Sequence, residues 1–165
     1  MPIEFDITLT SKDMYRFNMY QMYSGFHGWF SVVISIVIFV MAVRTYGQVE
    51  PMYTVLYVMF GIVFLIYLPG SLYLRSKHSL AASEVLRNAL HYTVGENGFA
   101  VSQGEASAEL PWAQIYKLVV TKSNVLVYSS RRNAYIIPRE QLGDAYGALV
   151  KLAEAKLEKF RLKLK

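Results

Sequence analysis

The sequence predicts a membrane protein of the α+β class. It combines an antiparallel two-helix transmembrane hairpin with a small antiparallel sheet or barrel closed by a C-terminal amphipathic helix. Three observations lead to this class: two long uncharged apolar runs, a short connection between them, and a polar segment of short alternating stretches after them. We therefore divide the chain into an N-terminal segment 1–23, a hairpin 24–74 and an aqueous domain 75–165.

Composition supports this division. Of the 165 residues, 54% are apolar and 18% are charged, below the roughly 25% charged residues of soluble domains. Residues 1–74 carry a net charge of −1, whereas residues 75–165 carry +6. An apolar part joined to a basic part is typical of an embedded segment followed by an aqueous one.

The hairpin is predicted from two spans, about 24–43 and 51–74. The second is a run of 24 residues without a charge, and about twenty apolar residues are enough to cross a bilayer. Seven residues, 44–50, leave room for little more than a turn. Both ends of the hairpin should therefore lie on one side of the membrane.

Two other interpretations of the apolar runs fit less well. A signal peptide begins with a basic region, but here Glu4, Asp6 and Asp13 precede the first run. A soluble helical hairpin needs a polar stripe, and the second run has no charged residue to form one.

Orientation follows from the positive charges that flank the spans. Lys12, Arg16, Arg75 and Lys77 lie on the terminal side, whereas the turn holds only Arg44. Because positive residues near spans stay in the cytoplasm, we expect both termini there.

Two local features of the hairpin have structural consequences. Ser31 and Ser35 form a small-xxx-small pair that lets two helices approach closely. Pro69-Gly70, near the end of the second run, indicates either a kink within a functional helix or a bend where the span leaves the membrane, and we favour the bend.

The segments beside the hairpin have patterns of their own. Residues 3–9 alternate apolar and polar, which predicts a strand able to pair with the sheet of the aqueous domain, and a short interfacial helix follows it. Residues 74–88 predict a helix that leaves the bilayer.

The aqueous domain is predicted to contain five or six antiparallel strands, with Trp112, Tyr135 and Ile137 in its core. Apolar residues recur every three or four positions from Arg139 to Lys165, which predicts one long helix. A meander of strands closed by such a helix is the outline of a small pleckstrin-homology-like (PH-like) barrel.

Several motifs occur together in order along the chain. They are Phe5–Asp13 before the hairpin, Tyr92-Thr93-Val94 with Gly98-Phe99, Leu110–Ile115, and Ala134–Arg139. With these motifs the chain resembles the bacterial YcxB-like family of small membrane proteins. The resemblance implies a PH-like cytoplasmic domain and a place in the bacterial inner (cytoplasmic) membrane, and it implies no established activity and no catalytic residues.

The reactive groups of the sequence do not predict an enzyme. There is no cysteine, and His27, His78 and His91 are scattered, so we expect no catalytic residue, no cofactor and no metal site. Nucleotide-binding and nucleophile-elbow motifs are absent from the sequence.

Basic side chains are the candidates for binding. Arg131 and Arg132, with Lys117 and Lys122, are predicted either to contact lipid head groups or a partner, or to be solvated turn residues without a ligand. The basic run 156–165 is expected to rest on the anionic leaflet rather than on nucleic acid, because its one aromatic residue, Phe160, is expected to pack inside.

The function predicted from these features is a non-enzymatic inner-membrane protein that tethers a PH-like domain to the cytoplasmic leaflet. There the domain would interact with membrane lipids and with a protein partner or a second copy in a homo-oligomer. One alternative is protection against membrane-active peptides or toxins, and another is an oligomeric channel.

Overall fold

The computed structural model describes residues 2–164, apart from the side chain of His27. The chain forms two compact units. We call Met1–Phe17 with His78–Lys165 the sheet unit, and Asn18–Lys77 the hairpin unit. The predicted class is confirmed in its coarse form, since the protein is α+β with two long apolar helices and two sheets.

The first sheet of the sheet unit joins segments from both sides of the hairpin. Its order is β1 (Ile3–Ile7), β2 (Leu90–Val94), β3 (Gly98–Gln103) and β4 (Ala106–Pro111), all antiparallel. Ile3 lies opposite Val94 and Ile7 opposite Leu90, which confirms that the N-terminal strand pairs with the sheet.

The second sheet is mixed. Its order is β7 (Ala134–Pro138), β6 (Asn124–Tyr128), β5 (Lys117–Val120) and β8 (Leu162–Leu164), and β8 runs parallel to β5. Residues 112–114 form a single 3-10 turn, η1, between the two sheets. In the described residues 2–164 the two sheets do not join, so the predicted closed barrel does not form.

The predicted C-terminal helix from Arg139 to Lys165 is wrong. The segment contains α5 (Arg139–Leu142), α6 (Ala145–Lys156), a 3-10 turn η2 (Lys159–Arg161) and then β8. Gly143 separates the helices with a φ of 49°, a conformation that favours glycine. Leu162 and Leu164 alternate with Lys163, and this strand pattern pairs with the open edge of β5.

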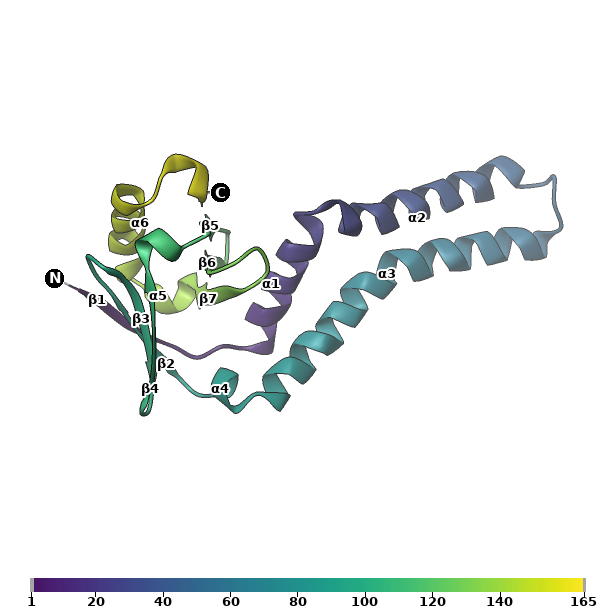
Figure 1. The fold of residues 1–165 in the computed structure, drawn as a ribbon. Helices are drawn as coiled ribbons and strands as arrows, with labels where there is room; N and C mark the ends of the chain where they lie inside the picture. The colour runs from purple at the N-terminus through teal and green to yellow at the C-terminus, as the bar shows by residue number, and fades with distance from the viewer. Residues whose placement is uncertain (1, 165) are drawn as a thin grey trace. The chain divides into compact units, whose positions relative to one another are not determined.

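The core of the sheet unit lies between its sheets and helices. All five residues of β6 are buried, and α6 contributes the buried Leu149 and Ala153. Helix α6 packs on β1, while α5 contacts both β1 and β7 (Figure 1). Helix α5 thereby connects β1 of the first sheet with β7 of the second.

The hairpin unit is built from α2 (Phe26–Thr45), most of α3 (Pro51–Ala82) and the second half of α1 (Ser11–Tyr23). Helix α3 continues past the predicted end of the span, and α4 (Glu84–Arg87) follows it. Pro69 lies inside α3, so the helix does not end there, although Figure 1 shows that α3 changes direction part-way along. Since proline removes one backbone donor, a bend within a continuous helix is its expected effect.

Helices α2 and α3 run side by side and meet at small residues (Figure 1). The Ser35 hydroxyl donates a 2.7 Å hydrogen bond to the Gly61 carbonyl, and a Cβ added to Gly61 would lie 2.9 Å from the Phe39 ring. The Ser31 hydroxyl instead bonds to the Gly28 carbonyl of its own helix. Of the predicted serine pair, Ser35 therefore makes the close approach.

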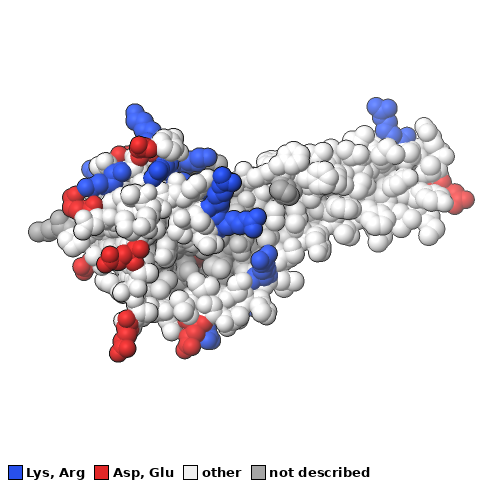
Figure 2. Space-filling view, viewed as in Figure 1, with Lys and Arg blue, Asp and Glu red and all other residues white. Residues whose placement is uncertain are grey.

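Most other apolar side chains of the hairpin are exposed. Val43 and Met52 are 77% and 69% exposed. In the most apolar 18-residue stretch of each helix, only 17% of α2 and 11% of α3 is buried. Figure 2 shows a hairpin surface almost free of charge between its turn and its other end. Both helices are long and apolar enough to cross a membrane, and unlike core helices of soluble proteins they are mostly unburied.

Replacing Gly61 with valine should separate α2 from α3. The new side chain would collide with the Phe39 ring and weaken the Ser35 hydrogen bond, so we expect a destabilisation of about 1–3 kcal/mol. Thermal unfolding of the purified protein in mild detergent measures this loss. Gly70→Val is the matched control, since a Cβ there meets nothing within 4 Å, and an equal loss in both variants would contradict the predicted contact.

Gly98 begins β3 with a φ of 151°, and an added Cβ would lie 2.3 Å from the Leu110 carbonyl oxygen. We expect Gly98→Ala to lower the free energy of unfolding of the sheet unit by about 1–3 kcal/mol, because both the conformation and the space exclude a side chain. Hydrogen exchange of the core strands measures it. Gly147→Ala, within α6 and in open space, should be neutral or stabilising.

Candidate functional site

The sheet unit contains an apolar pocket of about 500 Å³. Its floor is formed by Leu90 and Tyr92 of β2, Val101 of β3, and Ala106 and Ala108 of β4. The opposite walls come from three places in the chain: the segment from Leu9 to Phe17, the helix α4, and the first residues of β7. A volume of this size falls within the range of roughly 300–1,000 Å³ that small-molecule sites occupy.

The pocket exists because the inner face of the first sheet is filled at one end only. At the filled end, Phe99 packs edge-on against Trp112 with ring centroids 5.2 Å apart, and Leu110 is buried beside them. At the pocket end β4 supplies alanines, since Ala108 lies opposite Val101 and Ala106 opposite Gln103. Small side chains at these positions leave the space open.

Tyr92 forms the rigid part of the floor. It is 1% exposed, its ring stacks on Phe5 at 5.4 Å, and Tyr135 of the second sheet meets it edge-on at 6.4 Å. Burial, with a smaller contribution from Tyr135, raises the pKa of the Tyr92 hydroxyl. The phenol therefore stays neutral, and the floor carries no charge.

Polar groups stand at the edge of the pocket. Among the described residues that line it, Arg132 carries the only charged side chain. No carboxylate of the described residues lies within 4.0 Å of its guanidinium group, whereas the backbone N–H groups of Arg132 and Asn133 donate to the Ser130 hydroxyl. The loop is thus fixed by its backbone, and the cationic group remains unpaired within residues 2–164.

A glutamine amide secures the wall formed by α4. Gln103 donates from Nε2 to the carbonyl oxygens of Val85 and Ala89, at 3.0 and 3.4 Å. The Ser83 hydroxyl accepts from the Leu86 N–H and caps the helix. These bonds hold Val85 and Leu86 over the pocket although α4 has only four residues.

The four basic residues predicted as a contact group do not come together. Lys117 lies opposite Tyr128, at the end of the second sheet that also carries the turn with Arg131 and Arg132. Its Nζ atom sits 4.3 Å from the centre of the Tyr128 ring. Lys122 belongs to the turn between β5 and β6, so the length of β6 separates it from the other three.

The residues expected in the core occupy different environments. Trp112 is buried, and its indole N–H donates to the Gly95 carbonyl at 2.9 Å; Ile137 is fully buried. Tyr135 is half-buried and lines the pocket. Sequence reasoning missed the pocket, although the run Ala106-Ser107-Ala108 within a strand was a signal of missing bulk.

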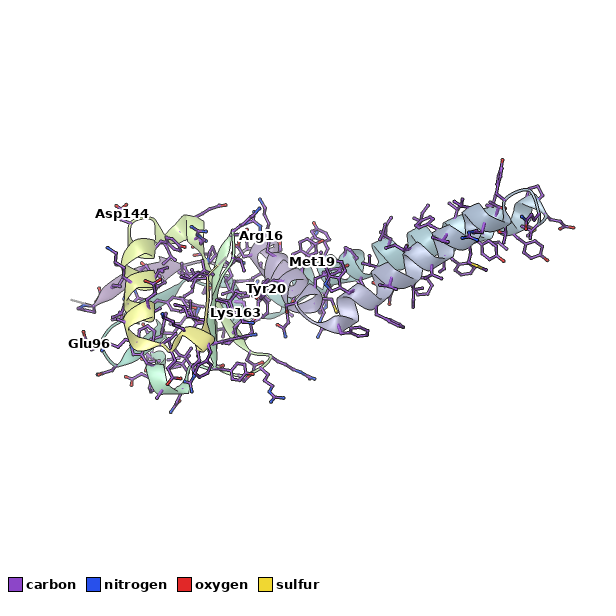
Figure 3. All side chains as sticks on the ribbon, turned by 90° about the horizontal axis from the view of Figure 1, so that it is seen from above. Arg16, Met19, Tyr20, Glu96, Asp144 and Lys163 are labelled. Atoms are coloured by element: carbon purple, nitrogen blue, oxygen red, sulfur yellow. The ribbon has the colours of Figure 1, made fainter. Side chains whose placement is uncertain are left out.

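Part of the C-terminal basic run is engaged within the unit. Lys156, at the end of α6, bonds to Glu96 of the β2–β3 turn, and Figure 3 shows Glu96 and Asp144 near opposite ends of α6. Arg161 donates to the carbonyls of Ala113 and Ile115. Phe160 is 74% exposed, so the expectation that it packs inside is wrong.

The start of α1 contains a second polar cluster with a structural role. The Thr10 N–H and hydroxyl donate to the Asp13 carboxylate, and the Asp13 N–H donates back to the Thr10 hydroxyl, which forms a capping box. Arg16 lies 3.9 Å from both Asp13 and Glu140. Among the side chains that the structure describes, no three from His, Asp or Glu gather as a metal site would require.

Comparison with known proteins agrees with the motifs of the sheet unit. Residues 94–153 match the family model described as YcxB-like protein. The sheet unit carries a YcxB-like region. The match extends from the end of β2 into α6 and includes the motifs at Gly98-Phe99, Leu110–Ile115 and Ala134–Arg139. It confirms the YcxB-like resemblance, while no curated protein and no solved structure matches the chain significantly.

The bond between Lys156 and Glu96 gives the stability of the sheet unit a measurable pH dependence. The hydrogen bond and charge of Lys156 lower the pKa of Glu96. The contribution of this ion pair to the stability of the folded unit is therefore complete above the ordinary glutamate pKa. It is lost as the pH falls through the lowered value. We expect Lys156→Met to return the pKa of Glu96 towards its ordinary range in an NMR titration.

Lys151→Met is the matched control, because Lys151 lies on the same helix and makes no ion pair among the described residues. An unchanged Glu96 pKa in Lys156→Met, or an equal change in both variants, would contradict the assignment.

Proposed function

We propose that this protein is a non-enzymatic, membrane-anchored binding protein of the bacterial inner membrane. Its helical hairpin crosses the membrane, and its sheet unit lies in the cytoplasm, where it binds a protein partner or a second copy of the chain. Membrane lipids contact the unit through its basic side chains. The observation that carries the proposal is the exposed apolar surface of α2 and α3.

In water this surface would be strongly unfavourable. Burying one large apolar side chain is worth about 1.5–3 kcal/mol, and the hairpin exposes many such side chains. Among them are Phe30, Ile36 and Val55, which are 55%, 56% and 58% exposed. A hydrocarbon environment removes this cost without any further protein contact, which supports insertion into a bilayer.

The polar groups of the hairpin also suit a bilayer. A hydroxyl in hydrocarbon needs an internal partner, because no water is present to bond it. Ser35 bonds across to Gly61, while Thr45 and Ser71 bond to carbonyls of their own helices, those of Met41 and Leu68. Each of these side chains thus has a hydrogen bond that does not depend on solvent.

The flanking charges support the orientation. Arg75 and Lys77 follow the second apolar run, and Lys12 and Arg16 precede the first, whereas the turn carries Arg44 with Glu50. Positive residues close to short spans favour the cytoplasmic side. With both termini there, the sheet unit lies beside the anionic cytoplasmic leaflet.

Cysteine labelling tests insertion and orientation together, since the natural chain has no cysteine. We expect Gln48→Cys, in the hairpin turn, to react with a membrane-impermeant maleimide in spheroplasts. Glu154→Cys, on the exposed side of α6, should react only after the membrane is opened. The reverse pattern would overturn the orientation, and extraction of the protein by alkaline carbonate would overturn insertion.

A further inference from the structure

We infer that the pocket of the sheet unit binds one acyl chain of an anionic amphiphile, such as a fatty acid, with its head group on Arg132. This inference rests on the proposed function, because an anchored sheet unit takes its ligand from the membrane. It names the chemical class that the pocket takes, and it rests on the shape of the pocket, its lining and its one charged side chain.

The interior of the pocket is suited to a hydrocarbon chain. The deep surface consists of Leu90, Val101 and the neutral ring of Tyr92, with the two alanines of β4 beside them. An acyl chain brings no polar group into this space, so its burial leaves no hydrogen bond unmade. Binding also removes the apolar walls of the pocket from contact with water. This burial contributes a favourable free energy of binding even when the ligand comes from a bilayer.

Flexible side chains complete the opposite wall. Met14 and Phe17 of α1 face the sheet across the pocket, and methionine adapts to irregular shapes because it has three rotatable bonds. A wall of this kind suits a chain without fixed stereochemistry. A rigid polar ligand would instead need several fixed donors and acceptors.

The charge at the edge selects an anion. Arg132 is the one charged side chain among the described lining residues, and no described carboxylate neutralises it. A guanidinium group binds a carboxylate or phosphate through two parallel hydrogen bonds. Asn133, the next residue of the same turn, also lines the pocket and offers a side-chain amide donor to such a head group.

A peptide strand fits the same pocket less well. Strand β4 is an edge of its sheet, so an extended peptide has backbone groups with which to pair. However, the peptide would carry its own N–H and C=O groups past walls that are mainly apolar, and their desolvation would be unfavourable. The lining therefore favours an acyl chain.

Photo-crosslinking in a defined membrane tests the inference. The full-length protein is placed in nanodiscs of phosphatidylcholine and irradiated with palmitic acid that carries a diazirine on its chain. We expect labelled peptides from β4 and β7 in addition to those of the spans. Labelling confined to α2 and α3 would overturn the proposal, whatever the outcome of the membrane-insertion experiment.

Two variant pairs separate specific binding from partition into the bilayer. Ala108→Trp should fill the pocket and reduce labelling of β4 and β7 at least ten-fold, whereas Ala155→Trp, exposed on α6, should leave it unchanged. Arg132→Gln should weaken binding about ten-fold, as expected for loss of a charge-assisted contact, and Arg131→Gln should not. Equal labelling in all four variants would refute a specific site.

The probe and its competitors identify the ligand chemistry. Unlabelled palmitic acid should compete for the pocket, and hexadecanol, which lacks the charge, should compete at least ten-fold less well. Phosphatidylglycerol in the nanodisc distinguishes the two sources of the chain: full competition by it would assign the ligand to a membrane lipid that inserts one chain, whereas competition by palmitic acid alone would assign it to a free fatty acid. Displacement by a strand-forming peptide, with none by palmitic acid, would overturn the acyl-chain assignment.

Discussion

The antiparallel pairing of β1 with β2 is the constraint on which the rest of the structure depends. These strands lie before and after the hairpin, and their register joins Ile3 to Val94 across most of the chain. Closing so long a loop carries an entropic cost, which the hairpin reduces because its two ends return to one place. Asn18 and Ser76, next to the points where the chain enters and leaves the hairpin unit, share a 2.8 Å hydrogen bond. The packing of the hairpin therefore lowers the entropic cost of pairing β1 with β2, the strands that precede and follow it in the sequence. Strand β2 in turn forms part of the floor of the pocket.

The pocket is a local exception in a well-packed unit. Phe99, Leu110 and Trp112 fill one end of the inner face, and their removal would leave a large cavity there. At the other end, larger residues at Ala106 and Ala108 would bury more apolar surface and would add stability. The alanines thus favour an open site at the expense of packing. A pocket beside an unpaired arginine combines two features that do not serve stability, and a binding role accounts for both.

The sequence predicted the elements whose signals are local. Long uncharged runs gave the two apolar helices, and alternation over residues 3–9 gave β1. It failed where a distant partner decided the outcome, as at Leu162–Leu164, which has helical spacing with the residues before it but pairs with β5 more than forty positions away. Pro69-Gly70 predicts a bend where the span leaves the membrane, and α3 continues through Pro69 as far as Ala82. The pocket could not be predicted from the sequence, because its walls come from segments far apart in the chain and its space depends on how those segments pack together.

The same distinction applies to charge. The net +6 of residues 75–165 suggested one basic surface for the membrane, but the structure divides its cations by role. Lys156 bonds to Glu96, Arg161 bonds to two backbone carbonyls, and Lys117 lies over the Tyr128 ring. These contacts hold turns and strands in place, so the side chains that make them are less free to reach a lipid or a partner. Arg131 and Arg132 stand in an exposed turn without a described carboxylate partner. Binding of an anionic group by this unit is therefore expected to depend on a particular arginine rather than on the total charge.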